Sequence, residues 1–173
     1  MAKRREEKPA KHKDIEGFLK EFLREESDRS VAILGAVFLD EYLKELIASF
    51  LVDDSKKVHD LLEGSLAPLG TFGSRIGAAY CMGLISQDAY HDLHIVREIR
   101  NKFAHELHGL SFSDTWVKNR CAELWLANKK KAPLVPGAPE DRQLFSRTVV
   151  VLFFELLQAT VEQIKQRRVV PTR

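Results

Sequence analysis

Cysteine is scarce in this 173-residue sequence, and the two cysteines, Cys81 and Cys121, belong to no paired spacing. Their separation excludes a disulfide framework, a zinc knuckle and a CxxC redox motif, and it favours a reducing cytoplasm. Neither GxSxG nor a glycine-rich phosphate loop occurs, so the usual signatures of serine hydrolases and nucleotide-binding proteins are missing.

Long apolar runs are absent as well. The longest, residues 149–154, is far shorter than the roughly 20 residues that a membrane-spanning helix needs. The basic N-terminus is followed by no apolar segment typical of a secretory signal. We therefore expect a cytoplasmic protein that has no membrane span and needs no cofactor.

Positive charge is concentrated at the two ends of the chain. Residues 1–13 and 165–173 together carry a net +8, so residues 14–164 carry −6 of the overall +2. Affinity for DNA comes largely from Lys and Arg that neutralise phosphates, so an acidic body is a poor surface for strong direct nucleic-acid binding. We expect flexible tails, residues 1–13 and 169–173, around one helical domain, residues 14–168.

Apolar residues recur at helical spacing through most of the chain. We predict helices that begin at Asp14 and at Asp28, lie over residues 57–62 and 72–85, follow the caps Ser86 and Ser113, and end the fold after a proline-rich connector, residues 132–140. Residues 149–154 have strand propensity, but the helical period continues beyond them, which favours a helix. The predicted fold class is all-α, a compact single-domain bundle of about six to seven helices.

The most specific pattern lies between residues 66 and 105. It consists of Pro68, Leu69, Gly70, Arg75, Tyr80, Gly83 with Leu84 and Ile85, and then Arg100 and His105. This pattern resembles the mannitol operon repressor family, which has a PLG turn, a basic residue, an aromatic residue, a Gly-x-Ile turn and an R-x4-H element. The resemblance implies an all-helical bacterial regulator of sugar-alcohol uptake genes. It also implies that the regulator has no DNA-binding motif of its own and works with a protein partner, for which a DNA-binding regulator is one option.

The segment from Arg100 to His105 also resembles the R-x4-H signature of HEPN domains, which are helical and usually dimeric. Many HEPN domains are metal-independent ribonucleases. Arginine can hold a phosphate through its fork of donors, and histidine can act as acid or base near neutral pH. The resemblance therefore implies an HEPN-like bundle and an alternative function, a toxin-like ribonuclease that uses Arg100, Asn101 and His105.

Helical geometry separates the two key residues of this element. At about 100° per residue, Arg100 falls inside an apolar stripe, whereas Asn101 and His105 fall on the opposite side. Arg100 and His105 are then about 140° apart. Catalysis would need the helix to end near Phe103, to bend, or to use a second subunit.

The alternative role for Arg100 is a buried guanidinium that ties two helices together. Such a group needs a carboxylate, because an unpaired buried charge is very costly. The candidate partners are Asp40, Glu41, Glu45 and Glu155.

Histidines at i,i+3 spacing invite a metal-site hypothesis. His91 and His94 form one pair, close to Asp88 and Asp92, and His105 and His108 form another. About 21 Å of helix separates the two pairs, so one ion cannot bridge them in a monomer, and we expect no metal site.

Two further clusters suggest nucleic-acid or acidic partners, but each has a simpler interpretation. Trp116 and Trp125 are expected to pack in the core or in a dimer rather than to stack on bases. Lys129, Lys130 and Lys131 are expected to form a solvated helix end.

Together these observations predict a non-enzymatic transcriptional regulator that works through protein contacts, as a homodimer. If the chain is instead an enzyme, we expect the ribonuclease described above.

Overall fold

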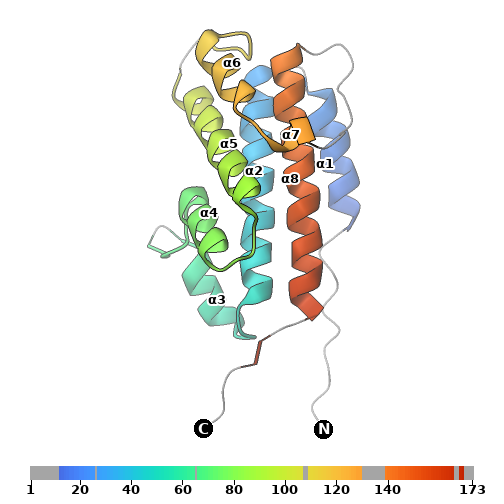
Figure 1. Ribbon diagram of the computed structural model, residues 1–173. Coiled ribbons are helices and arrows are strands. Elements are labelled where there is room, and N and C mark those ends of the chain that lie inside the picture. The colour runs from blue at the N-terminus through green and yellow to red at the C-terminus, as the bar shows by residue number, and fades with distance from the viewer. Residues whose placement is uncertain are drawn as a thin grey trace.

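The structure is a computed structural model that describes residues 12–25, 27–64, 66–106, 109–129, 139–165 and 168–169. Within these residues every regular element is a helix (Figure 1). The elements are α1 (His12–Arg24), α2 (Asp28–Phe50), α3 (Ser55–Leu62), α4 (Phe72–Cys81), α5 (Gln87–His105), α6 (Thr115–Ala122), α7 (Leu126–Lys129) and α8 (Glu140–Lys165). The predicted all-α class is confirmed. The connector and the two basic tails lie largely outside the described residues.

Polar side chains begin most of the helices. Ser86 caps α5 as predicted, because its Oγ accepts a hydrogen bond from the Ala89 amide at 3.1 Å. Thr71 and Ser74 form a reciprocal capping box at the start of α4. The prediction for the first helix was wrong: α1 begins at His12, so Asp14 lies inside the helix.

The predicted helix after Ser113 is broken in two. Asp114, not Ser113, precedes α6, and the chain leaves helical geometry after Ala122 before α7 begins at Leu126. The cause is the fully buried carboxylate of Asp92 on α5. It accepts hydrogen bonds from the backbone amides of Trp125, at 3.0 and 3.1 Å, and Leu126, at 2.8 Å. These amides start a new helical turn instead of continuing α6.

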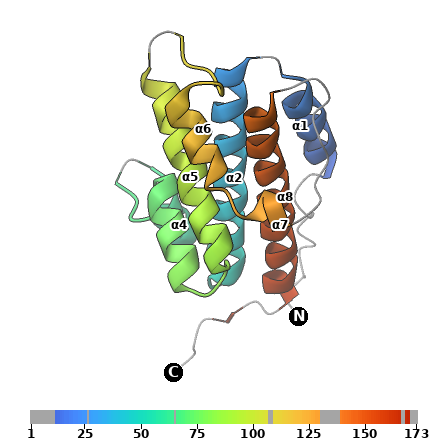
Figure 2. The same ribbon diagram turned by 45° about the horizontal axis from the view of Figure 1, so that its top comes forward.

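Helix α2 is the centre of the bundle and contacts α1, α4, α5 and α8. Figure 2 shows α4 and α6 beside α5, with α1 on the far side of α8. Helices α2 and α8 run in the same direction, and α5 runs opposite to both (Figure 1). Their apolar faces meet in one continuous core, whose largest fully buried side chains include Phe22, Phe103, Phe112, Phe145 and Phe153.

The parallel arrangement of α2 and α8 brings their N-termini together. There the Asp28 carboxylate accepts hydrogen bonds from the Phe112 amide at 2.9 Å and from the Arg142 guanidinium at 3.0 Å. Arg142 is buried and also donates to the Glu25 carbonyl. At the other end of α2, the guanidinium carbon of Arg168 lies 3.5 Å from the centroid of the Phe50 ring.

The composition and length of α8, over Glu140–Ile164, would also suit a membrane span, which the short apolar run in the sequence did not reveal. More than half of its most apolar window is buried against the other helices. Packing in the bundle core therefore accounts for the apolar composition of this helix.

Two helical glycines make a matched test of how closely α2 and α8 approach. A Cβ built on Gly35 would lie 3.0 Å from Val149 and 3.2 Å from Phe22, whereas one built on Gly77 meets nothing within 4 Å. We expect Gly35→Leu to lower the free energy of unfolding by about 1–3 kcal/mol through overpacking. Gly77→Leu should not lower the free energy of unfolding, because leucine has the better helix propensity and a Cβ at this position meets no neighbouring atom. Urea denaturation of both variants measures the difference, and equal stabilities would contradict the close approach.

Candidate functional site

Arg75 carries one of two buried guanidinium groups among the described residues, the other being that of Arg142. Its Nη1 lies 2.7 Å from Oδ1 of Asp40 on α2, and the residue is only 6% exposed. Its Nε donates to the Leu69 carbonyl at 2.9 Å, and its Nη2 donates to the Leu62 carbonyl at 2.7 Å. One side chain thus ties α2, the end of α3 and the following turn to α4. Burial is the larger effect on Asp40 and raises the pKa of its carboxyl above 3.8, although Arg75 works against that rise.

The PLG turn belongs to the same junction. The Leu69 amide donates to the Leu61 carbonyl at 3.0 Å, and the Gly70 amide donates to the Ala67 carbonyl at 2.9 Å. A Cβ on Gly70 would lie only 2.6 Å from the backbone oxygen of Gly64, so a side chain has no room there. Pro68 in the same turn is exposed. The family pattern at this place shapes the junction between α3 and α4.

The second half of the pattern ends α4. Gly83 has φ +70, a conformation that favours glycine, and its amide donates to the Tyr80 carbonyl at 2.9 Å. The ring of Tyr80 is 42% exposed and packs on Tyr90 of α5, with ring centroids 4.5 Å apart. Tyr80 therefore points to the surface rather than into the core.

Arg100 does not take the place in the core that the apolar stripe predicted. Ile99 is fully buried instead, and Arg100 is half-buried and donates through Nη1 to Asn101 Oδ1 at 2.9 Å. Within the described residues no carboxylate pairs with Arg100, and Asp40, the first candidate partner, pairs with Arg75. The predicted stripe is buried, but it left out Ile95 and Ile99, and their burial turns the centre of the inner face away from Arg100.

Helix α5 continues through His105. To bring Arg100 and His105 to one phosphate by a helix end, it would have to stop near Phe103. His105 is exposed, and regular helical geometry leaves it about 140° around the axis from Arg100. The two side chains therefore form no joint phosphate site within one continuous helix.

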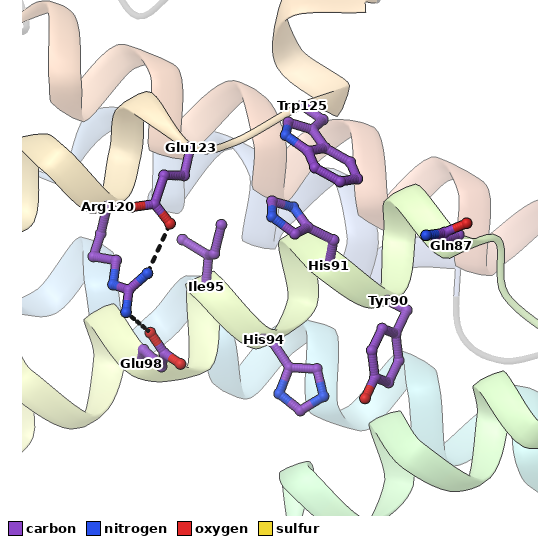
Figure 3. A pocket seen from close by; sticks show the side chains of 9 residues that line it. All are labelled: Gln87, Tyr90, His91, His94, Ile95, Glu98, Arg120, Glu123 and Trp125. Atoms are coloured by element: carbon purple, nitrogen blue, oxygen red, sulfur yellow. Dashed lines mark hydrogen bonds and ion pairs between the residues drawn. The ribbon is translucent and has the colours of Figure 1, made fainter.

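A groove of about 370 Å³ runs along the outer face of α5, with the corner between α6 and α7 as its wall (Figure 3). His91 lies flat on Trp125, with ring centroids 3.6 Å apart and planes within 8°. Nδ1 of His91 is 2.9 Å from Oδ1 of the buried Asp92. The same carboxylate therefore fixes the backbone of Trp125 and the ring that stacks on it.

Charged groups at one end of the groove are paired with one another. Arg120 on α6 lies 2.7 Å from Glu123 and 3.1 Å from Glu98 on α5, as the dashed lines in Figure 3 show. Its guanidinium carbon is also 5.8 Å from the Trp116 ring centroid. Arg120 therefore holds both carboxylates in place at the edge of the groove.

His94 lies on the side of the groove that faces α4. Its Nδ1 is 3.5 Å from Nη1 of Arg97, its ring meets Tyr90 edge-on at 4.6 Å, and its buried Nε2 has no hydrogen-bond partner among the described residues. Burial, followed by the charge of Arg97, lowers the pKa of His94 below 6.5. A neutral ring is thus favoured there at neutral pH.

The tryptophans and histidines at the groove were singled out from the sequence, but they were not predicted to form a common surface. Trp116 and Trp125 are each 40% exposed, so of the two packing roles expected for them the core is wrong, and packing in a dimer stays a prediction. His91 and His94 line the groove, and among the described residues no three possible metal ligands gather at one point. His108, Lys130 and Lys131 lie outside the described residues. The missed signal was the spacing of Arg120 and Glu123, three residues apart beside two tryptophans.

Removing the buried guanidinium should have a large effect on stability. Arg75→Leu leaves the Asp40 carboxylate and two carbonyl groups without their donor, so we expect a loss of about 3–5 kcal/mol in the free energy of unfolding. Lys20→Met breaks the exposed pair with Glu16 and should leave the free energy of unfolding nearly unchanged. Chemical denaturation separates the two, and similar small losses would show that Arg75 is not a structural tie.

The lowered pKa of His94 gives stability a defined pH dependence. Below pH 6.5 the imidazole of His94 is protonated more fully in the unfolded chain than in the folded protein. The free energy of unfolding should therefore fall as pH drops below this value. His94→Phe should reduce this loss while leaving the trend at about pH 8 unchanged. Burial raises the pKa of Asp40 above 3.8 and that of Glu45 above 4.5. At lower pH these two groups therefore increase the free energy of unfolding as pH falls, opposite to His94. The comparison of thermal unfolding therefore stays above about pH 5.5, and parallel curves for the two proteins would refute the assignment.

The chain matches the mannitol repressor family over residues 14–171. A search of curated protein sequences finds no significant match. Among solved structures, the chain is similar to one described as the MtlR–HPr complex from Escherichia coli, with a TM-score of 0.59 and 20% sequence identity. The similarity covers 86% of this chain and 97% of the other. At this identity the structural likeness shows the fold, whereas the sequence match spans most of the chain: this protein belongs to the mannitol repressor family.

Proposed function

We propose that this protein is a transcriptional regulator of the mannitol repressor family that acts through contacts with a protein partner and does not read DNA by itself. The observation that carries the proposal is family membership over residues 14–171, in a family whose fold occurs in a protein solved in complex with HPr. A protein of the HPr kind is accordingly the partner that we propose to test first.

The charge distribution supports this mode of action. Residues 14–164 carry a net −6, as expected for a body that does not grip phosphates. Three of its arginines, Arg75, Arg120 and Arg142, already pair with carboxylates. The paired carboxylates neutralise the positive charge of these arginines, which therefore contributes little to attraction of a duplex.

The ribonuclease alternative gains little from the geometry. Arg100 is engaged by its neighbour Asn101, and the uninterrupted helix carries His105 round to a different face. A second subunit would have to supply one of the two groups. A homodimer is part of our proposal, and sedimentation of the purified protein measures it directly.

The proposal is tested with two probes on the same preparation. In isothermal calorimetry we expect saturable binding of E. coli HPr, and in a mobility-shift assay we expect no sequence-selective binding of a mannitol-operon control fragment. Tight, selective DNA binding with a steep salt dependence would contradict the partner-dependent mechanism. Absence of HPr binding would remove this class of partner.

A further inference from the structure

Two arginines of α5, Arg97 and Arg100, have no negatively charged partner in the part of the chain that the structure describes. Three other arginines, Arg75, Arg120 and Arg142, each pair with a carboxylate. Arg97 and Arg100 are half-buried, so they have also lost part of their contact with water. A guanidinium that loses water needs a compensating negative group. Neither the fold nor the proposed function explains this uncompensated pair.

The polar contacts of the two arginines are with uncharged or basic groups of the same helix. Nη1 of Arg97 lies 3.5 Å from Nδ1 of His94, and Nη1 of Arg100 donates to Oδ1 of Asn101 at 2.9 Å. An imidazole and an amide supply no negative charge. Glu98, which follows Arg97 in the chain, is held by a guanidinium of α6 at 3.1 Å. The positive charges of both arginines therefore remain available.

The first turn of α4 fixes the position of Arg97. Helices α4 and α5 lie side by side and run in opposite directions, so α4 begins beside the middle of α5 (Figure 1). A Cβ on Gly73 would lie 3.1 Å from Nε and 3.3 Å from Cζ of Arg97, so the guanidinium packs directly against this glycine. The N-terminal end of a helix is itself partially positive. The first turn of α4 therefore adds to the positive field at Arg97 and does not compensate it.

The spacing of the two arginines lets them act on one ligand group. Residues three apart are neighbours on a helix surface, with Cβ atoms roughly 5–6 Å apart. Each guanidinium presents a planar fork of N–H donors, and in each of them only Nη1 has a polar contact among the described residues. Two positive charges with spare donors match a phosphate monoester, which is close to a dianion near neutral pH and has several acceptor oxygens. A carboxylate would compensate only one of the two charges.

The surroundings favour one isolated phosphate group over a nucleic-acid backbone. Residues 14–164 carry a net −6, and the carboxylate of Glu98 lies on the same helix beside Arg97. A chain of phosphates that passed over Arg97 would meet this acidic surface on both sides of the pair. A small molecule with a single phosphate group would not.

We propose that Arg97 and Arg100 bind the phosphate group of a small phosphate monoester, and that the absence of a side chain at Gly73 lets the guanidinium of Arg97 lie in the binding position. The site lies within one chain and needs no protein partner, so it goes beyond the proposed function and does not depend on it. It also gives Arg100, a residue of the family pattern, a role that its burial and contacts do not otherwise explain.

The test measures ligand binding to the purified full chain, without HPr, at constant ionic strength. Glucose 6-phosphate is the monoester probe and inorganic phosphate is the second probe, and each is titrated in calorimetry and in thermal unfolding. We expect saturable binding of glucose 6-phosphate together with a rise in the unfolding temperature, because a ligand that binds only the folded state stabilises it. Saturation by both probes supports recognition of the phosphate group alone, and saturation by glucose 6-phosphate alone supports a site that also contacts the organic part.

Substitution of either arginine should remove the binding. Arg97→Gln and Arg100→Gln should each raise the dissociation constant about tenfold or more, because charge-assisted hydrogen bonds to the phosphate are lost. Lys102→Gln is the charge control. It removes one positive charge from the same helix, where Lys102 pairs with Glu106 at 3.2 Å, and it should change the dissociation constant by less than about twofold.

A pair of glycines on α4 tests the geometry without a change of charge. Gly73→Ala places a Cβ against the guanidinium of Arg97 and should weaken binding about threefold or more. Gly77→Ala lies on the same helix, where a Cβ meets nothing within 4 Å, and should leave the dissociation constant unchanged. Thermal unfolding without ligand checks the folding of every variant, and Gly73→Ala keeps the test decisive if an arginine variant unfolds.

Three results would overturn the phosphate site. One is the absence of saturable binding of either probe. A second is equal binding to the unaltered chain and to Arg97→Gln and Arg100→Gln, which would show an adventitious ion only. A third is a single-stranded RNA oligonucleotide that displaces glucose 6-phosphate at a far lower concentration and loses its binding in Arg97→Gln, which would make the pair an RNA contact. Calorimetry with HPr is a separate measurement: failure there removes the proposed partner and leaves the phosphate site standing.

Discussion

The buried carboxylate of Asp92 determines more of this structure than any other polar group. It lies in the middle of α5 with no exposed surface, and three hydrogen-bond donors from two segments meet it. A buried charge is tolerated only when it is fully satisfied in this way. Its partners are the ring of His91 and the backbone amides of Trp125 and Leu126, at which α7 begins. The break after α6 and the wall of the groove along α5 therefore have the same cause.

A second buried group, the guanidinium of Arg75, organises the junction between α3 and α4. Its guanidinium satisfies one carboxylate and two backbone carbonyls, which fixes the loop between α3 and α4. Two glycines of the family pattern act through their backbone geometry at the two ends of α4: Gly70 in the loop before the helix and Gly83 in the turn after it. Most of the quoted family pattern therefore shapes the two ends of α4. The groove along α5 is lined mostly by residues that do not belong to this pattern.

Sequence periodicity predicted the helices well where burial follows hydropathy, as in α2, α5 and α8. It failed where a polar residue is buried. Asp92 broke the helix expected after Ser113. On α5 the predicted stripe left out Ile95 and Ile99, and their burial turns the inner face away from Arg100. A buried arginine was predicted to be Arg100, paired with one of four carboxylates that included Asp40. Asp40 pairs with Arg75 instead, through long-range geometry that no local pattern contains. The groove escaped notice because tryptophan is normally read as a core residue.

The parallel packing of α2 against α8 has a consequence for synthesis of the protein. Asp28 and its partner Arg142 are 114 positions apart, so the most apolar helix acquires its main neighbour only when nearly the whole chain exists. Contacts of such long range slow folding and leave apolar surface open in the meantime. Helices α4 and α5 precede α8 in the chain and also pack on α2, so during synthesis they are available to cover part of the apolar surface of α2 before α8 is made.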